Sequence, residues 1–573
     1  MADLIPPSHP RLAALDKLYH AVLGLPRHLG QHSGGIVICG RGLDEVVPIQ
    51  PAAMPGRNVV QWDKDDCEDL GLVKIDLLGL GMLAAMEDMI RICRRTKKDF
   101  ELADIDLEDK AVYDMLHRSD TVGTFQVESR AQMATLSILK PNNFYEVAIQ
   151  VAIVRPGPIV GDLLHPYLRR RNGLEKTDWI DHRFRDVLER TLGVPLFQEQ
   201  VLKMAEIIAG FSGSEMTSLR RAMSFNRSDK RMKEVTAKLR ECMARRNVKE
   251  EVQEKVVHAV GNFALYGFPE SHALSFASIA YWSCWFKVHH PAAFYTGLLN
   301  NQPMGFYSAH SLIQDAKRHG VKIRPVSCVH SSIATDVAGD GAIRLGLHRL
   351  RGVSAAVQAK IVREREQRPF ESLEDFLARV RPNEPERRLL AKAGALNDLP
   401  RVAHRRDAMW QVELPLYGDL IAAPPAPPAL AMMTPAERVA ADFSIQGAST
   451  GAHPMKLWRE RHPELQLPRA CDLKILPHRF PVQVAGLVIC RQRPGTAKGH
   501  CFISLEDETG IANLFVHVKT FRQLKLVIVS EPFLLAEGRI QISEGGQPTV
   551  FVTDIRPLPG ATAALAAGSH DFH

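Results

Sequence analysis

The stretch "GLVKIDLLGLGMLAAMEDMIRICRRT" (residues 71–96) changes its hydrophobic period part-way along. Residues 71–78 carry β-branched and aliphatic side chains after a glycine, as does "GGIVICG" (34–40), and both segments are typical of strands. From residue 79 the spacing becomes helical, and Leu80, Leu83, Met86 and Ile90 share one face. The stretch therefore predicts a strand that leads into an amphipathic helix.

Two charges, Lys74 and Asp76, stand inside this otherwise apolar run. Side chains alternate between the faces of a strand, so both project the same way. A lysine and a carboxylate on one rim can pair, bind a metal or meet a phosphate. A single carboxylate makes a poor metal site, however, because Mg²⁺ in phosphoryl transfer takes one or two carboxylates plus substrate phosphates. From periodicity alone, the favoured alternative is that Asp76 caps the following helix.

The composition is that of an ordinary multidomain globular protein. The chain has 573 residues, 45% hydrophobic and 24% charged, which predicts three or four domains. A net charge of +7 permits a polyanionic partner without requiring one. The nine cysteines form no CxxC pair, which fits a reducing compartment. Without a signal-peptide pattern or a long apolar run, we expect a cytoplasmic protein with no membrane contact.

The remaining chain falls into three regions of different pattern. Residues 110–330 are predicted to be mainly helical, with breaks at 155–161, 210–214 and 267–271, and residues 340–410 to form short amphipathic helices. A Pro/Ala tract at 420–435 is typical of a linker. Five strands with short turns then suggest a β-barrel of OB type, a common scaffold for binding single strands; they are expected at 482–489, 501–507, 511–518, 533–542 and 549–555.

A basic cluster lies in "SLRRAMSFNRSDKRMKE" (218–234), where Arg220 and Arg221 are adjacent. The forked donors of arginine suit bidentate contact with phosphate. A solvated basic face interleaved with Asp229 and Glu234 is an equally good interpretation of the charges alone.

A third segment, "YGFPESHALSFASIAYWSCWFKVHHPAAFYTGLLNNQP" (266–303), places His272 near a helix start, with Ser271 as a possible cap. Tyr281, Trp282, Trp285 and Phe286 follow it. As bare sequence, this aromatic stripe favours a core position over a base-stacking platform.

The segment "IRLGLHRLRGVSAAVQAKIVRERE" (343–366) resembles a helix–hairpin–helix, with its turn at 350–353. In that motif, backbone N–H groups of the turn and the next helix hold a DNA phosphate without reading sequence. We assign DNA contacts to Arg349, Arg351, Gly352 and Ser354, where Ser354 replaces the usual second glycine. An ordinary helical hairpin is the alternative.

Several ordered motifs resemble bacterial C-family DNA polymerases, the group of the polymerase III α subunit. They are "PRHLGQHSGGIVI", "VVQWDKDDCEDLGLVKIDLLGLGML", "VAIVRPGP", "GVPLFQEQVLKMAEIIAGFSGSEMTSLRRAM" and "YGFPESHALSFASIAYWSCWFKVHHPAAFY". The resemblance is closer to the error-prone lesion-bypass (ImuC-type) branch, because of "GFPESHA", "LVICRQRPGTAKG", "LEDETG" and the terminal "DFH".

The resemblance implies a palm in which three aspartates hold two Mg²⁺ ions. Asp76 matches the third aspartate and Lys74 its basic neighbour. Arg220 and Arg221 match arginines that contact the incoming dNTP. Arg155 and His272 match other positions near the nucleotide.

The same resemblance implies that parts of the enzyme are missing from this chain. Neither the paired aspartates nor the PHP domain precedes Asp76, so we expect a C-terminal half that extends no primer alone. The expected domains are the end of the thumb (1–25), a partial palm (26–115), fingers (116–335), the hairpin module (336–415), connecting helices (416–480), the OB domain (481–560) and a tail (561–573). The fold class is thus multidomain: an α+β partial palm, mainly α fingers, a helix–hairpin–helix module and a C-terminal OB barrel.

Primer–template DNA and dNTP are the expected partners. ImuB-like and ImuA-like accessory proteins are further expected partners. The sliding clamp is expected to bind only indirectly, because "QVELPLYGDL" (411–420) is a weak clamp motif with Tyr417 where a phenylalanine is usual. The alternatives are a non-catalytic DNA-binding remnant and a fragment of the replicative α subunit.

Overall fold

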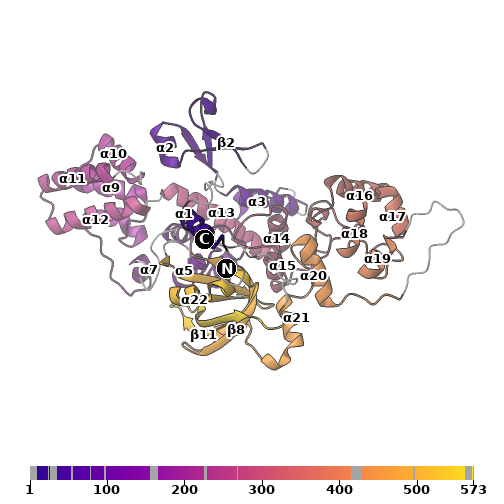
Figure 1. Cartoon of the computed structure of the whole chain (residues 1–573). Helices are drawn as coiled ribbons and strands as arrows, with labels where there is room; N and C mark the ends of the chain where they lie inside the picture. The colour runs from indigo at the N-terminus through magenta and orange to yellow at the C-terminus, as the bar shows by residue number, and fades with distance from the viewer. Residues whose placement is uncertain are drawn as a thin grey trace. The chain divides into compact units, whose positions relative to one another are not determined.

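The computed structural model describes residues 10–23, 25, 35–52, 56–77, 79–95, 99–154, 166–224, 229–266, 269–414, 429–493, 497–561, 569 and 571. The chain divides into two compact units, Met1–Leu80 and Gly81–His573, which are described separately (Figure 1). Within the described residues, no helix has the length and apolarity needed to cross a membrane.

The first unit is built from short elements. These are α1 (Leu12–Val22), β1 (Gly35–Ile38), β2 (Ile49–Pro51), β3 (Asn58–Val60), α2 (Lys64–Asp69) and β4 (Val73–Asp76). β1 pairs antiparallel with β4, and β2 pairs antiparallel with β3. Both strands predicted around residues 34–40 and 71–78 therefore form, and they lie side by side.

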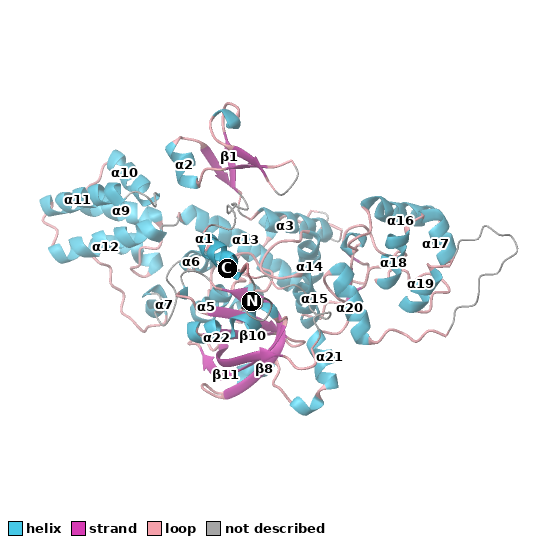
Figure 2. Ribbon diagram, in the orientation of Figure 1, coloured by secondary structure: helices cyan, strands magenta, loops and turns pink. Residues whose placement is uncertain are grey.

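The second unit begins with helices, as its periodicity predicts (Figure 2). They are α3 (Leu80–Cys93), α4 (Lys110–His117), α5 (Arg130–Leu139), α6 (Phe144–Ile153), α7 (Pro166–Arg171), α8 (Arg185–Leu188), α9 (Gln198–Ala209), α10 (Gly213–Ser224), α11 (Asp229–Arg245), α12 (Glu250–Tyr266), α13 (Glu270–His289), α14 (Pro291–Asn300) and α15 (Ala309–Arg318). The break predicted at 210–214 is confirmed, because Gly210 ends α9 in the left-handed conformation that glycine adopts without strain. The first predicted break, at 155–161, lies outside the described residues.

The rest of the unit carries a small sheet, more helices and a barrel. The sheet consists of β5 (Ile323–Arg324), β7 (Ile343–Arg344) and β6 (Asp336–Val337). The helices are α16 (Ala355–Gln367), α17 (Leu373–Val380), α18 (Glu384–Lys392), α19 (Arg405–Gln411), α20 (Pro435–Gln446) and α21 (Pro454–Arg461). Most of the predicted linker, residues 420–428, falls outside the described part of the chain.

The five predicted C-terminal strands form a closed barrel of order β10-β12-β11-β8-β9. They are β8 (Pro481–Gln492), β9 (Cys501–Glu506), β10 (Ile511–Val516), β11 (Phe533–Ile542) and β12 (Pro548–Pro557), with α22 (Val518–Ser530) between β10 and β11. The predicted third strand was too long, because His517 already caps α22 by accepting from the backbone N–H of Lys519. Closure of the barrel removes the unpaired strand edges.

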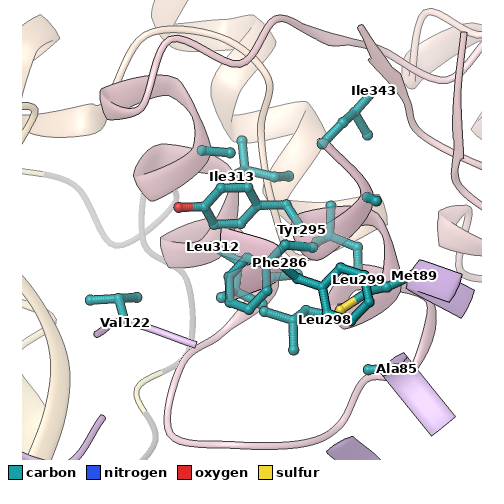
Figure 3. Packing of buried hydrophobic residues seen from close by; sticks show 14 of the residues in the cluster. Ala85, Met89, Val122, Phe286, Tyr295, Leu298, Leu299, Leu312, Ile313 and Ile343 are labelled. Atoms are coloured by element: carbon teal, nitrogen blue, oxygen red, sulfur yellow. The ribbon is translucent and has the colours of Figure 1, made fainter. Parts of the chain in front are cut away.

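The largest core of the second unit surrounds α13, α14 and α15 (Figure 3). Phe286, Tyr295 and Leu299 are fully buried there, and Met89 of α3 packs with them. Tyr281 is also fully buried, and Trp282 and Trp285 pack partly buried against the same core. The core interpretation of the aromatic stripe is therefore confirmed.

The helix predicted after residue 79 forms as α3, but the apolar face named for it is only partly buried. Met86 of that face is 2% exposed, whereas Leu80 and Leu83 are 53% and 43% exposed, and Met82, Ala85 and Met89 complete the buried side. Residues on several sides of α3 are apolar, so periodicity alone did not select the buried face. Ser271 is not the cap of α13, because Pro269 occupies the N-cap position.

Candidate nucleic-acid and nucleotide interface

The ladder between β1 and β4 fixes where Lys74 and Asp76 stand on the backbone. Asp76 is opposite Gly35, and Lys74 is opposite Val37. The two residues are two apart in one strand, so they belong to the same face of the ladder. Asp76 is the last residue of β4 and α3 begins at Leu80, so Asp76 does not occupy the N-cap position of that helix. The capping alternative is therefore wrong.

The predicted phosphate-binding arginines lie on a separate group of helices. Arg220 is exposed on α10, and Arg221 follows it in the same helix. α9, α10, α11 and α12 enclose a core of their own, which includes Leu219 and Met223 on either side of the arginine pair. α10 is therefore held firmly by its apolar side chains. Arg155 lies outside the described residues.

His272 is exposed in the first turn of α13, and its ring centroid lies 4.0 Å from that of Phe276. Glu270, at the first position of the same helix, accepts a hydrogen bond from the hydroxyl of Tyr145, and its backbone N–H donates to Glu199. The start of α13 is thereby tied to α6 and α9.

The hairpin turn requires a glycine at residue 352. Gly352 has φ +88°, and an added Cβ would lie 2.7 Å from Cδ1 of Leu389. Ser354 then caps α16, because its hydroxyl accepts from the backbone N–H of Val357. The turn and helix start thus have the geometry of a hairpin module.

One of the phosphate-binding groups expected in this hairpin already has a partner. The backbone N–H of Ser354 donates to Oε1 of Glu386 at 2.9 Å, and Oε2 of Glu386 accepts from the backbone N–H of Asn383. Although burial opposes ionisation, these hydrogen bonds hold the pKa of Glu386 below its usual range. An internal carboxylate therefore competes with a DNA phosphate at this position.

The two arginines of the hairpin differ in exposure. Arg349 is half-buried and donates to the carbonyl of Gln446, at the end of α20. Arg351 is exposed, and its backbone N–H donates to the carbonyl of Ile445. Arg351 is therefore the better placed of the two for a phosphate.

The barrel presents a row of aromatic side chains that sequence reasoning missed. Phe502 of β9 is opposite Phe515 of β10, which is opposite Phe551 of β12, which is opposite Arg539 of β11. Ring centroids of successive phenylalanines are 5.5 Å and 5.2 Å apart. Phe551 is 40% exposed, and Arg539 is also exposed. Phe502, Phe515, Phe551 and Arg539 are called the aromatic row below.

The alternation of the strands is the signal that could have found this row. Ile503, Leu514 and Val550 are buried inside the barrel, so their neighbours in sequence point outward. Outward aromatic side chains next to a basic residue are typical of surfaces that bind single-stranded nucleic acid.

A cavity of about 400 Å³ lies between the barrel and the helices of the second unit. Its lining includes Arg118, Glu128 and Arg130 from the helical side and Phe502, Ser504 and Asn513 from the barrel. Nη1 of Arg130 donates to the carbonyl of Leu514 at 2.7 Å, and its guanidinium lies 5.0 Å from the ring centroid of Phe502. Burial raises the pKa of Glu128 to about 8.

Two groups of described side chains bring possible metal ligands close together. In the first, His310, His453 and Glu506 bring ligand atoms within 4.8 Å of one another. Nδ1 of His453, however, accepts from the backbone N–H of Met455, so Nε2 carries the ring proton in the neutral form. Oε1 of Glu506 accepts from Arg318 and Oε2 from Ser311. Glu506 and Nδ1 of His453 are thus committed to hydrogen bonds, whereas both ring nitrogens of His310 and Nε2 of His453 are buried with no hydrogen-bond partner among the described residues.

In the second group, Asp120, Asp315 and His319 are similarly close. Nζ of Lys287 lies 3.3 Å from Asp120 and 3.0 Å from Asp315, so one ammonium already pairs with both carboxylates. The side chain of Asp76 lies outside the described part of the structure. One carboxylate alone does not complete a site for the pair of Mg²⁺ ions that the resemblance implies.

Models of known protein families match four successive parts of the chain. Residues 3–79 match the bacterial DNA polymerase III alpha NTPase domain, and residues 80–247 match the finger domain of the same subunit. Residues 320–408 match a helix-hairpin-helix motif, and residues 482–558 match an OB-fold nucleic acid binding domain.

The chain resembles bacterial error-prone DNA polymerases. It is 46% identical over 577 residues to the error-prone DNA polymerase of Anaeromyxobacter dehalogenans, covering 96% of this chain and 50% of the relative. The error-prone DNA polymerase of Alkalilimnicola ehrlichii is 43% identical, covering 99% of this chain and 56% of that relative. That of Dechloromonas aromatica is 41% identical with the same coverages. The chain thus spans about half the length of these error-prone polymerases.

Proposed function

We propose that this chain is the DNA-holding and nucleotide-binding half of an error-prone DNA polymerase that acts in translesion synthesis. The observation that carries the proposal is the 46% identity over nearly the whole chain to a protein named error-prone DNA polymerase. The ordered family matches from residue 3 to residue 558 support it.

In this function, Asp76 is one of three metal-binding aspartates, and Lys74 lies beside it on the same face of the ladder. Arg220, Arg221, Arg155 and His272 contact the incoming dNTP. The roles of Asp76 and Lys74 are supported by their two-residue spacing in β4. The role of Arg220 is supported by its exposure on α10, a helix held by a core of its own. Mg²⁺ remains the metal that we propose, with its other carboxylates supplied from outside the described residues.

DNA is held by two further surfaces. In the hairpin, Arg351, Gly352 and Ser354 contact the phosphates. Arg349 supports the hairpin by donating to the carbonyl of Gln446 in α20. Phe515 and Phe551 of the aromatic row bind the single-stranded template by stacking, and Arg539 contacts its phosphates. ImuB-like and ImuA-like proteins, with indirect contact to the sliding clamp, remain the expected partners; residues 415–420 of the clamp-like segment lie outside the described residues.

We infer that the chain alone incorporates no nucleotide, because one aspartate does not complete a two-metal site. The test is primer extension with the purified chain, together with fluorescence anisotropy of a primer–template with a single-stranded overhang. We expect salt-dependent binding without extension, since phosphate contacts release counterions. Binding that does not change between low and moderate salt would overturn the nucleic-acid function, and metal-dependent extension would overturn the inactivity.

A second candidate function is a DNA-binding protein without catalysis. The observation that favours it is the single aspartate at the end of β4. Restoration of primer extension by the half of an error-prone DNA polymerase that this chain does not match would exclude this candidate.

A further inference from the structure

The cavity between the barrel and the helices is lined by three cations that lack a counter-charge. Arg118 and Lys474 are exposed, and Arg130 is half-buried. Within the described residues, none of the three forms an ion pair with a carboxylate, and Arg130 donates instead to the carbonyl of Leu514. Burial lowers the pKa of Arg130 to about 10, because an ionised guanidinium is costly to remove from water. A bound anion would offset that cost.

The acidic side chains of the same cavity are already engaged. Asp120 and Asp315 share the ammonium of Lys287, and Asp315 also lies 3.3 Å from a guanidinium nitrogen of Arg318. Glu128 keeps its proton up to about pH 8, because burial raises its pKa to about 8. The charge that the cavity presents to a ligand is therefore positive.

The walls of the cavity are joined by direct contacts between the helices and the barrel. An added Cβ on Gly545 would lie 1.9 Å from Oγ of Ser137, so the turn between β11 and β12 packs closely on α5. Arg130, the first residue of α5, donates to a carbonyl of β10, and Arg318 of α15 donates to Glu506 of β9. The cavity is thus formed before any ligand binds.

The rest of the lining suits a nucleotide. Phe502 and Tyr307 supply aromatic rings, and the amide side chains of Gln492, Asn513 and Gln547 supply donors and acceptors of the kind that base edges pair with. The volume of about 400 Å³ lies within the range of small-molecule sites. A ligand with a negative group, a flat ring and hydrogen-bonding edges matches this lining.

We propose that this cavity binds one nucleotide unit, with its phosphate on Arg118, Arg130 and Lys474 and its base beside Phe502. The nucleotide is either free in solution or part of a single strand that lies along the aromatic row, since both present the same phosphate and base. The second source rests on the proposed function, whereas the first does not.

The test is photocrosslinking of the whole chain with 5-iodo-dUMP and with an oligo-dT that carries one 5-iodouracil. Peptide mapping should place the crosslink on Tyr307 or Phe502, which both line the cavity. Labelling by 5-iodo-dUMP identifies a free nucleotide as the ligand, and labelling by the oligonucleotide alone identifies a nucleotide of a single strand. Labelling of neither residue by either probe would overturn the proposal.

The double variant Arg118→Gln/Lys474→Gln removes two exposed cations and should weaken this labelling about tenfold, as expected for the loss of charge-assisted hydrogen bonds to a phosphate. Arg522→Gln/Lys525→Gln is the matched control, because both residues are exposed on α22 and neither lines the cavity. Equal labelling of the two double variants would contradict the proposal. Arg130→Met tests the third cation, and the first double variant remains informative if Arg130→Met does not fold.

Failure of the cavity and failure of the proposed function give different results. Crosslinks of the oligonucleotide confined to Phe515 and Phe551 would contradict the cavity site and leave single-strand binding intact. Crosslinks of 5-iodo-dUMP in the cavity, without binding of any DNA, would support the cavity site and contradict the proposed function.

Discussion

The backbone N–H of Ser354 donates a 2.9 Å hydrogen bond to the carboxylate of Glu386, which is 32 residues further along the chain. This bond places a negative charge at the start of α16, where a hairpin of this type receives a DNA phosphate. We therefore expect the affinity of the hairpin for DNA to depend on a side chain 20 residues beyond the 343–366 segment.

Glu386→Gln should tighten binding of duplex DNA at low salt. Removal of a like charge several ångströms from a phosphate is worth about 0.5–1 kcal/mol, or roughly two- to fivefold in Kd. One acceptor is lost as well, so the variant should unfold about 1 kcal/mol more easily. Fluorescence anisotropy with a labelled duplex measures the first effect. Glu371→Gln, an exposed residue of the same module, is the control, and equal affinities of the two variants would contradict the competition.

Phe551→Ala should weaken binding of single-stranded DNA while leaving the fold intact. Stacking of a base on an aromatic side chain contributes about 1–3 kcal/mol, and we expect a loss of roughly five- to tenfold because Phe551 is only partly exposed. Titration of an oligo-dT measures the loss. Phe480→Ala is the matched control, since Phe480 is 43% exposed in the same domain but outside the aromatic row. Arg539→Gln should lower the slope of log affinity against log salt concentration by about one. An unchanged slope would show that Arg539 does not contact the DNA phosphates.

Glu128→Gln should make the chain less sensitive to pH. Burial raises the pKa of Glu128 from 4.5 to about 8, so the folded chain keeps a proton that the unfolded chain releases in this range. Stability from this group is complete below about pH 4.5 and is lost as the pH rises toward 8, by at most about 5 kcal/mol. Thermal unfolding between pH 5 and 8 should therefore show a larger fall in Tm for the native chain than for Glu128→Gln. The exposed Glu374→Gln should behave as the native chain does, and parallel curves for all three would contradict the shift.

Lys287→Met should be strongly destabilising. Lys287 is 2% exposed and donates to Asp120 and Asp315. Its loss removes a buried counter-charge from Asp315, which keeps Arg318 at 3.3 Å and the hydroxyl of Tyr295, and should cost about 3 kcal/mol. The double variant Lys287→Met/Asp315→Asn should lose less than the sum of the single variants. Arg368→Met removes an exposed ion pair with Glu371 and should change the free energy of unfolding by less than about 1 kcal/mol. Urea unfolding measures the free energy of unfolding of each of these variants. An effect of Lys287→Met as small as that of Arg368→Met would contradict the prediction.

Local patterns predicted the barrel because each strand carries its own signal. Buried residues such as Ile503 and Leu505 alternate with outward ones, and turns separate the strands. The same alternation could not say which outward residues meet across strands, so Phe502, Phe515 and Phe551 were not recognised as a row. Register between strands that are distant in sequence decides that arrangement.

The candidate site was predictable where it follows from one segment and not where two segments meet. The two-residue spacing of Lys74 and Asp76 fixed their common face, and Gly352 marked the hairpin turn. The pairing of Ser354 with Glu386 and the contact of Arg349 with Gln446 join segments 32 and 97 residues apart. No periodicity within either segment encodes such contacts.

The links between the barrel and the helices have a mechanical consequence. Arg318 and Ser311 of α15 contact Glu506, and Arg130 of α5 contacts Leu514, across 188, 195 and 384 residues of chain. The C-terminal barrel is thus held against these helices by non-covalent contacts as well as by the linking chain. A protease cut anywhere between residues 320 and 480 should leave two fragments that still travel together on a sizing column.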